Sequence, residues 1–487
     1  MRKRSNMLAG NVDEAQKRAF RSLDAHRRPS SSSWAGELSS SALATAMSCL
    51  ALHLQPEHTA MRTAVCSGLS WLAETQRADG GWGDAIDDAS SKNATTIAAS
   101  VLQYCAAGDY PDQIHEARRW IERAGGFPVV NDPRAMSMSG PARSLYALAG
   151  FVGWDRVRKL PTEVILLPRR IRRTLSITFS SILSFSIMQE HFAPVPTWRR
   201  PVRQLAIKKA VEWLGHAQGS DGSYGESALL ASITVVAFTL SGVDADDTVR
   251  RALRFIRESQ RPDGSWPIDR DLENFDTAQA VLAYHEAGLH IPESQRVREW
   301  FLEHQFRMPC FHTSSPPGGW AWAYPAGWPD MDDTAYTLRC LRILGVPPGH
   351  EAVRFGLLWL YQMQNSDGSW PTFVRNSKVP FDRGCPYITA QALSTLSAMG
   401  PTERRSEPVR EALSYLREHQ YLDGSFYSLW FRTYTRGTAA VIEALVDLNL
   451  ADDPVVYRAA EWLRAHQNAD GGWGDGQGAG STAEETS

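Results

Sequence analysis

Closely spaced cysteines are missing from this chain. Its six cysteines stand far apart, and no two of them have the CxxC spacing of a zinc ribbon or a redox motif. They are Cys49, Cys66, Cys105, Cys310, Cys340 and Cys385. The same wide spacing argues against a disulfide scaffold, so we expect free thiols in a reducing, cytoplasmic compartment.

The sequence also has no excess of charge and no long apolar run. Lys and Arg total 51 against 54 Asp and Glu, a net charge of −3. This argues against a nucleic-acid binder that relies on a basic surface and against an acidic disordered tail. The best apolar run, Thr174–Met188, is shorter than the roughly 20 residues that cross a bilayer. No apolar segment follows the basic Met1–Arg4, so no secretory signal is predicted.

Basic and aromatic residues flank the apolar run. They are Arg169, Arg170, Arg172, Arg173, Trp198, Arg199, Arg200 and Arg203. One interpretation is a buried helix with a solvated basic approach. The other is a patch that rests on the inner face of a membrane as a peripheral contact.

Tryptophan, by contrast, is abundant, with 17 residues, and it follows a repeat. The pattern aromatic–Leu/Ile–x3–Gln–x2–Asp–Gly–x–aromatic, which we call the repeat unit, occurs six times. The copies are 71–82, 213–224, 255–266, 359–370, 415–426 and 462–473, with degenerate copies at Trp120 and at Trp300–Gln305. The first aromatic and the Leu share a helix face, Gln falls near the helix end, and Asp-Gly forms a turn. We interpret the units as structural staples between helices.

Helical periodicity fills the chain between these units, and no segment alternates convincingly as a strand. Apolar residues recur at helical spacing from Ala335 to Leu344, for example. That helix is predicted to stop at Gly345, with Pro347 beyond. The sequence therefore predicts an all-α fold.

Three aspartates open this helix, in the stretch DMDDTA at 330–335. Carboxylates this close cannot all ionise cheaply, so mutual repulsion and burial raise at least one pKa. A carboxylic acid kept protonated at neutral pH can serve as a proton donor. The alternative is a cluster of helix caps. Large aromatics precede the stretch, namely Trp320, Trp322, Tyr324 and Trp328, and ring faces stabilise carbocations.

A second copy of the acidic spacing serves as a comparison. DADDT at 244–248 opens a helix from Val249 to Glu258 that carries four arginines. We interpret this copy as ordinary helix caps on an exposed outer helix, and we place the acid chemistry at Asp332 instead.

These motifs resemble those of a known family. The repeat units resemble the QW repeats of the squalene–hopene and oxidosqualene cyclases, and DMDDTA resembles the DxDDTA motif of class II terpene cyclases. The resemblance implies two α/α barrels, one inserted into the other, with a cavity between them. We expect an N-terminal barrel domain at 1–270 and a catalytic barrel domain at 271–487.

The resemblance also implies roles for individual residues. Asp332 matches the proton donor, and Asp330 and Asp333 match the partners that hold and tune it. The expected cavity wall for substrate and cations consists of Trp320, Trp322, Trp328, Phe275, Phe373, Trp430 and Tyr434. Tyr387 and Gln391 stand where hopene cyclases carry an Asp and a His that bond the acid. Both are neutral, so we expect tuning by hydrogen bonds and burial alone.

The function implied is protonation-initiated cyclisation of a linear isoprenoid, with no cofactor. Squalene or a related polyprene is the first expectation, although the stretch that dips into the membrane in hopene cyclases is reduced here to Pro194–Lys208. A farnesyl or geranylgeranyl diphosphate substrate is the alternative, with magnesium possible only in that case and Lys92 as a candidate for the diphosphate.

Other uses of an α/α barrel fit less well. A protein prenyltransferase needs a zinc site, and Asp382 and Cys385 have no nearby His. Ionisation-type terpene synthases need DDxxD, which Asp87–Ser91 does not match. An inactive remnant is the remaining alternative, because of the C-terminal segment. Thr482 and Glu485 form a capping box after the last repeat unit, and Ser487 follows directly. We therefore expect a second barrel without its closing helices.

Overall fold

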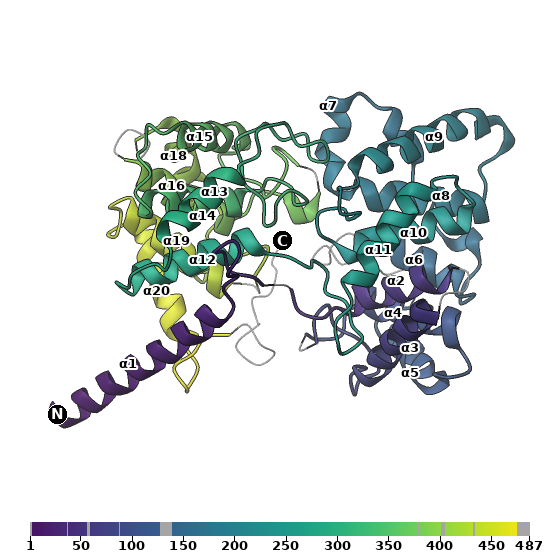
Figure 1. Ribbon diagram of the computed structural model, residues 1–487, viewed down its shortest axis with the longest axis horizontal. Coiled ribbons are helices and arrows are strands. Elements are labelled where there is room, and N and C mark those ends of the chain that lie inside the picture. The colour runs from purple at the N-terminus through teal and green to yellow at the C-terminus, as the bar shows by residue number, and fades with distance from the viewer. Residues whose placement is uncertain are drawn as a thin grey trace.

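The computed structural model describes residues 2–36, 38–55, 59–86, 88–126, 139–377, 379–400, 405–431 and 434–474. Within these segments the chain folds into helices joined by loops, with isolated bridges and no named strand. Two groups of helices lie side by side, α2 to α11 on the right and α12 to α20 on the left of Figure 1. The prediction of an all-α double barrel is confirmed.

Ten α-helices of the first group lie in the described segments. They are α2 (Ala42–His53), α3 (Thr59–Glu74), α4 (Lys92–Ala106), α5 (Pro111–Arg123), α6 (Ser139–Leu148), α7 (Arg169–Arg172), α8 (Phe179–Phe192), α9 (Arg200–Ala217), α10 (Ala228–Ser241) and α11 (Asp246–Glu258). Short 3₁₀ turns join them, including η2 (Thr162–Leu166) and η4 (Thr197–Arg199).

The second group holds the predicted catalytic helix. Its members are α12 (Glu273–Glu286), α13 (Ser294–Glu303), α14 (Met331–Ile343), α15 (Glu351–Met363), α16 (Pro386–Met399), α18 (Glu407–Glu418), α19 (Thr435–Asp447) and α20 (Pro454–Ala465). The long first helix, α1 (Arg2–Ala25), extends below this group in Figure 1. As predicted, α14 ends just before Gly345, which takes a left-handed φ of +82°.

Each group has an inner and an outer layer, and the composition of the helices decides which layer they join. Inner helices such as α10 and α16 have no charged side chain and are buried on nearly all sides. The outer α11 instead buries one stripe, formed by Thr248, Ala252, Phe255 and Ile256. A helix that is apolar all round must be covered on every face, which a double-layered barrel achieves.

The repeat units staple neighbouring helices together. In each of the six units, the Gln side chain donates to the glycine carbonyl of its own Asp-Gly turn. In five of them the same amide reaches a backbone carbonyl of another helix, as Gln364 reaches Pro408 at the start of α18 at 2.9 Å. The closing Trp370 donates to the Leu360 carbonyl at 2.9 Å near the end of α15, where helix carbonyls lack intrahelical partners. The interpretation of the repeat units as structural staples is confirmed. The indole of the closing Trp370 is hydrogen-bonded directly to the end of α15.

Removing the indole donor from a buried staple should destabilise the fold. Trp370 is fully buried, so Trp370→Phe leaves the Leu360 carbonyl without its partner and opens a small cavity. We expect the free energy of unfolding to fall by about 1–3 kcal/mol. Trp473 makes the same bond to Leu463 at 2.7 Å but is 45% exposed, so Trp473→Phe should cost less than about 1 kcal/mol. Urea unfolding followed by circular dichroism measures both, and equal losses would contradict the explanation.

The N-terminal segment packs on the second group rather than the first. Phe20 in α1 lies 4.6 Å from the Tyr284 ring, and Trp34 belongs to the same buried core as α12 and α14. The core of the first group runs from Ala42 to Trp266. Residues such as Phe20 and Trp34, which we predicted to belong to the domain at 1–270, therefore pack in the core of the second group. Residue 271, between the two cores, remains our proposed boundary.

Several sequence-based expectations can be placed on these helices. The apolar run forms the buried helix α8 after a 3₁₀ turn, as the first interpretation held. The DADDT copy is exposed, with Asp247 paired to arginines of its own helix. From the sequence we expected Lys92 in the loop after Trp82, but it is the first residue of α4. Asp87 and the Thr482–Glu485 capping box lie outside the described residues, and the unclosed barrel stays a prediction.

Candidate active site

Three carboxyl groups meet at the start of α14. Asp330 caps this helix, and its Oδ1 accepts a hydrogen bond of 2.8 Å from the backbone N–H of Asp333. Its own N–H donates to the Trp320 carbonyl at 3.0 Å. All three aspartates are buried, and Asp332 keeps 8% of its surface exposed. The capping interpretation and the acid interpretation thus apply to the same cluster.

Asp330 and Asp333 form a coupled pair. Their carboxyl groups are hydrogen-bonded to each other, and burial raises the pKa of Asp330 well above its usual range. Burial also raises the pKa of Asp333 to about 6, although Asn274 opposes the shift by donating to its Oδ1 at 2.9 Å. The two carboxyl groups therefore titrate as a pair, and burial together with their mutual repulsion disfavours a second negative charge on it.

Asp332 is held as a neutral acid by its surroundings. Burial raises the pKa of its carboxyl group well above the usual range, and the charge of Asp333 raises it further. Arg436 and Arg339 act in the opposite direction and lower this pKa. The Oδ1 atom of Asp332 is buried and has no hydrogen-bond partner among the described residues. A proton on this Oδ1 atom would therefore not be hydrogen-bonded to another described protein group.

The two residues expected to orient the acid act less directly. The hydroxyl of Tyr387 bonds that of Tyr336 at 2.8 Å, and Arg436 donates to the Tyr336 oxygen at 3.3 Å. Gln391 accepts from Arg339 at 2.8 Å. No hydrogen bond joins Tyr387 or Gln391 to Asp332 within the described residues. The expectation that hydrogen bonds and burial alone tune the acid is wrong, because after burial the charges of Asp333, Arg436 and Arg339 also act on its pKa.

The position of Arg339 near the acid could have been predicted from the sequence. Arg339 follows Asp332 by seven residues, two turns later on the same helix face. Arg436 comes from α19, far along the chain, and only the packing of α16 between α14 and α19 brings it near.

A cavity of about 690 Å³ lies between the two groups of helices. On the side of the second group, its wall is a set of edge-to-face aromatic rings: Trp322, Trp328, Phe373 and Trp430. The acid adjoins this wall through the backbone, because the N–H of Met331 donates to the Thr372 carbonyl at 2.9 Å. From the sequence we also expected the DMDDTA stretch at 330–335 to line this cavity, but the three aspartates are not among its lining residues.

Three of the predicted wall residues lie elsewhere. Trp320 is a staple, whose indole donates to the Phe301 carbonyl at 2.7 Å. Tyr434 packs on Tyr421 and Trp462 at the outer helices. Phe275 contacts the Tyr336 ring at 5.8 Å, beside the acid but not on the cavity wall.

The first group of helices supplies the opposite side of the cavity. Three cations line it, Arg143, Arg158 and Lys159, together with one carboxyl group, Asp269. Gly225 brings the two sides into contact: a Cβ there would lie 3.1 Å from Trp322 and Trp328, and its φ is +67°. Only glycine allows this close approach of the backbone to the indoles.

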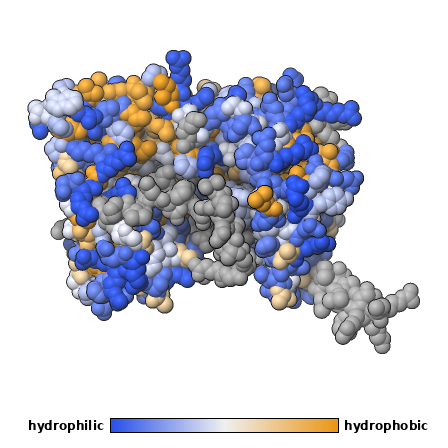
Figure 2. Space-filling model, turned by 180° about the vertical axis from the view of Figure 1, so that it is seen from behind, coloured by the Kyte–Doolittle hydropathy of each residue, from blue (hydrophilic) through white to orange (hydrophobic). Residues whose placement is uncertain are grey.

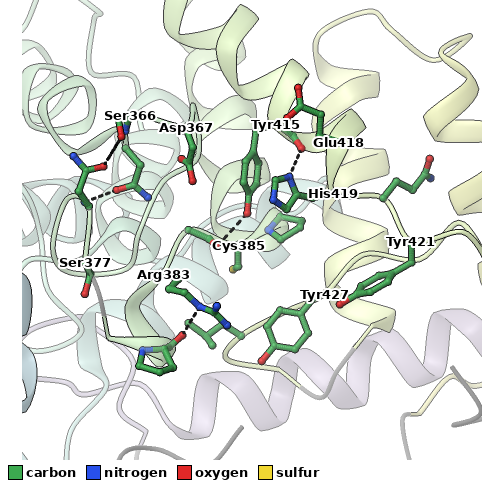
Figure 3. A pocket seen from close by; sticks show the side chains of 17 residues that line it. Ser366, Asp367, Ser377, Arg383, Cys385, Tyr415, Glu418, His419, Tyr421 and Tyr427 are labelled. Atoms are coloured by element: carbon green, nitrogen blue, oxygen red, sulfur yellow. Dashed lines mark hydrogen bonds between the residues drawn. The ribbon is translucent and has the colours of Figure 1, made fainter. Parts of the chain in front are cut away.

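A second pocket, of about 840 Å³, opens at the N-terminus of α16 (Figure 3). Polar and aromatic side chains line it, including Asp367, Tyr415 and His419. Cys385 lines this pocket, but Asp382 does not. The Oδ1 atom of Asp382 instead accepts a hydrogen bond of 2.7 Å from the backbone N–H of Phe373. Among the described residues no three metal-ligating side chains gather, so the zinc interpretation finds no support in them.

Comparison with known proteins agrees with this geometry. The models of the squalene-hopene cyclase N-terminal and C-terminal domains match residues 17–186 and 273–485, and a prenyltransferase alpha-alpha toroid domain matches 146–312. The chain belongs to the squalene–hopene cyclase family. It is therefore a class II terpene cyclase, an enzyme that starts its reaction by protonation.

Relatives of this cyclase include both hydrocarbon and diphosphate cyclases. The squalene–hopene cyclase of Bradyrhizobium diazoefficiens is 27% identical, over 83% of this chain and 72% of its own length. A drimenyl diphosphate synthase from Streptantibioticus cattleyicolor is 30% identical over 46% of this chain and 43% of its own. The fold matches that of ent-copalyl diphosphate synthase from Streptomyces platensis with a TM-score of 0.60 and 19% identity, covering 94% of this chain and 84% of the other.

Proposed function

We propose that Asp332 is the acid with which this cyclase protonates a terminal alkene of a linear isoprenoid. The π electrons of the alkene take the proton from the carboxyl group and form a C–H bond. The carbocation that results is attacked by the next alkene of the folded chain. The observation that carries the proposal is the buried carboxyl group of Asp332, whose pKa is raised by burial and which lies behind the segment that carries the aromatic wall.

The neighbours of Asp332 support this step in different ways. Asp333 keeps the acid protonated beforehand, and Arg436 and Arg339 stabilise the carboxylate that remains after transfer. The faces of Trp322, Trp328, Phe373 and Trp430 are suited to stabilising positive charge without forming bonds to it.

The lining of the cavity favours a substrate with an anionic head. A hydrocarbon such as squalene has no group that would interact with Arg143, Arg158 and Lys159, whereas a diphosphate has several oxygens for them. The prenyl tail would then lie toward the aromatic wall. We therefore favour farnesyl or geranylgeranyl diphosphate over squalene, with these cations in place of the Lys92 considered from the sequence. Magnesium would enter only as a counterion of the diphosphate.

Incubation in deuterated water tests both parts of the proposal. With squalene, farnesyl diphosphate and geranylgeranyl diphosphate offered separately, we expect a diphosphate to be cyclised with its diphosphate retained. Its product should carry one solvent deuterium at the carbon that was protonated first, as seen by mass spectrometry and NMR. A product without solvent deuterium would contradict initiation by protonation, and a preference for squalene would contradict the anionic head.

We also propose that this cyclase touches a membrane surface. Six exposed apolar side chains gather over η2, α7, η4 and α9: Leu166, Leu167, Ile171, Trp198, Val202 and Leu205. Figure 2 shows apolar residues near the upper edge of the first group of helices. Basic residues such as Arg170 and Arg200 stand beside them, a combination that suits an anionic lipid surface. Every helix in the described segments is too short or too polar to cross a bilayer.

Vesicle sedimentation tests the membrane contact. Trp198 is 79% exposed, and its burial in the lipid interface should contribute about 1.5–3 kcal/mol. Trp198→Ser should therefore weaken binding to anionic phospholipid vesicles about tenfold or more. Tyr457 is 60% exposed on α20, away from this surface, so Tyr457→Ser is the control and should bind as the unmodified chain does. Equal binding by all three proteins would contradict the contact.

A further inference from the structure

A second carboxyl group, Asp269, faces the cavity from the side opposite the acid. It lies in an extended segment that pairs with residues 226–228, where Asp269 forms a bridge with Ser227. Asp269, Ile268 and Ser227 all line the cavity. Two residues before Ser227, Gly225 touches Trp322 and Trp328, so this segment stands against the aromatic wall.

No cation is paired with Asp269 among the described residues. The next residue, Arg270, is bound to Glu226 at 3.2 Å instead. Burial raises the pKa of Asp269 to about 7, and only the hydroxyl of Ser227 opposes the shift. Burying a carboxyl group that forms no ion pair of its own is costly for the fold, so the place of Asp269 on the cavity surface calls for a role in the chemistry.

The surroundings of Asp332, behind the aromatic wall, and of Asp269, on the cavity surface, act differently on their carboxyl groups. Asp332 is held neutral by burial and by the charge of Asp333. Asp269 has no such anion among the causes of its shift and is ionised in a substantial fraction of molecules near neutral pH. Asp269 lines the cavity and Asp332 lies behind the aromatic wall, so carboxyl groups with different surroundings stand on opposite sides of it, an arrangement that can divide the roles of acid and base.

We propose that Asp269 is the base that ends the cyclisation. Its carboxylate removes a proton from a carbon next to the final carbocation. The electron pair of that C–H bond becomes the π bond of an alkene, and the proton stays on Asp269 until it is lost to solvent. Each turnover takes one proton from Asp332 and delivers one to Asp269. Asp332 then regains a proton from solvent, so no further reactant is needed. The inference rests on the proposed function, because it requires the cation that Asp332 creates.

The products of Asp269→Asn test this role. An amide keeps the size of the side chain but cannot accept the proton. We expect the unmodified enzyme to make mainly one cyclic alkene, and the variant to consume substrate and still incorporate solvent deuterium at the first protonated carbon. Its main product should change to alcohols from water capture or to other alkene isomers.

Glu226→Gln is the matched control. Glu226 is a buried neighbour with a pKa raised by burial to about 7, but it is paired with Arg270 and does not line the cavity. This variant should keep the original product mixture. If Asp269→Asn does not fold, Asp269→Glu moves the base by one methylene and should change the ratio of alkene isomers.

Other results would overturn the assignment. These are an alcohol as the main product of the unmodified enzyme, or the original mixture from either Asp269 variant. Absence of turnover in the unmodified enzyme would instead count against the proposed function, so the two failures can be told apart.

Discussion

Asp332→Asn is expected to abolish cyclisation while the fold stays intact. An amide has the shape of the carboxyl group but cannot transfer a proton to an alkene. Loss of the acid should lower turnover by at least about a thousandfold. Stability should not fall much, because the substitution removes a buried ionisable group that is repelled by Asp333. Product formation by gas chromatography and mass spectrometry, with thermal unfolding by circular dichroism, measures both effects.

The second acidic stretch supplies the control for this experiment. Asp246 has the same position in DADDT, but it is exposed at the start of α11. Asp246→Asn should leave turnover unchanged and cost at most about 1 kcal/mol, because Asp246 lies in the first turn of α11 and makes no side-chain cap bond. Near-native product from Asp332→Asn, or loss of product from a folded Asp246→Asn, would contradict the choice of acid.

Arg436→Gln is expected to change the pH dependence of turnover. Asp332 must be protonated to act, so turnover falls as the pH rises through its pKa. Arg436 favours the carboxylate and lowers this pKa, so without the arginine the pKa is higher. The falling limb should therefore move to higher pH, by about one unit. At pH values below that limb, turnover should be about tenfold lower, because a weaker acid transfers its proton less readily.

The conservative variant separates charge from packing at this position. Arg436 also bonds Tyr336 and lies over the Tyr387 ring, so its removal could disturb the site without any electrostatic effect. Arg436→Lys keeps the charge and should keep the falling limb near its original pH. A limb that moves to lower pH in Arg436→Gln, or one that does not move at all, would show that this arginine does not tune the acid.

Much of the architecture could be predicted from the chain because its causes are local. The repeat unit places Gln, Asp-Gly and an aromatic within twelve residues, and those same residues bond one another in the fold, as Gln364 and Trp370 do. The acid cluster is local as well, since Asp330 caps the helix that carries Asp332 and Asp333. The spacing of residues along the chain was therefore enough to identify both the repeat units and the aspartate cluster.

Errors arose where a local pattern had been interrupted. Trp320 closes the unit that begins at Trp300, but a longer loop separates it from Gln305, and Gln305 bonds Gly318 and Ala352 as the other glutamines bond their partners. From the sequence it was grouped with Trp322 and Trp328 because it stands beside them in the chain. Side chains two residues apart in an extended segment need not serve the same purpose.

By itself, then, the sequence determined the helices, the staples and the three aspartates, because each depends on residues that are neighbours in the chain. The tertiary structure decided which groups surround the reaction. Arg436 reaches the acid only through the packing of α19 and α16, and Asp269 shares a cavity with Trp322 and Trp328 only because two separate barrels enclose it. The protonation state of a carboxyl group depends on every charge and apolar atom around it, whatever their distance in sequence. Spacing along the chain therefore revealed the acid, while the fold determined its strength and the place of the proposed base.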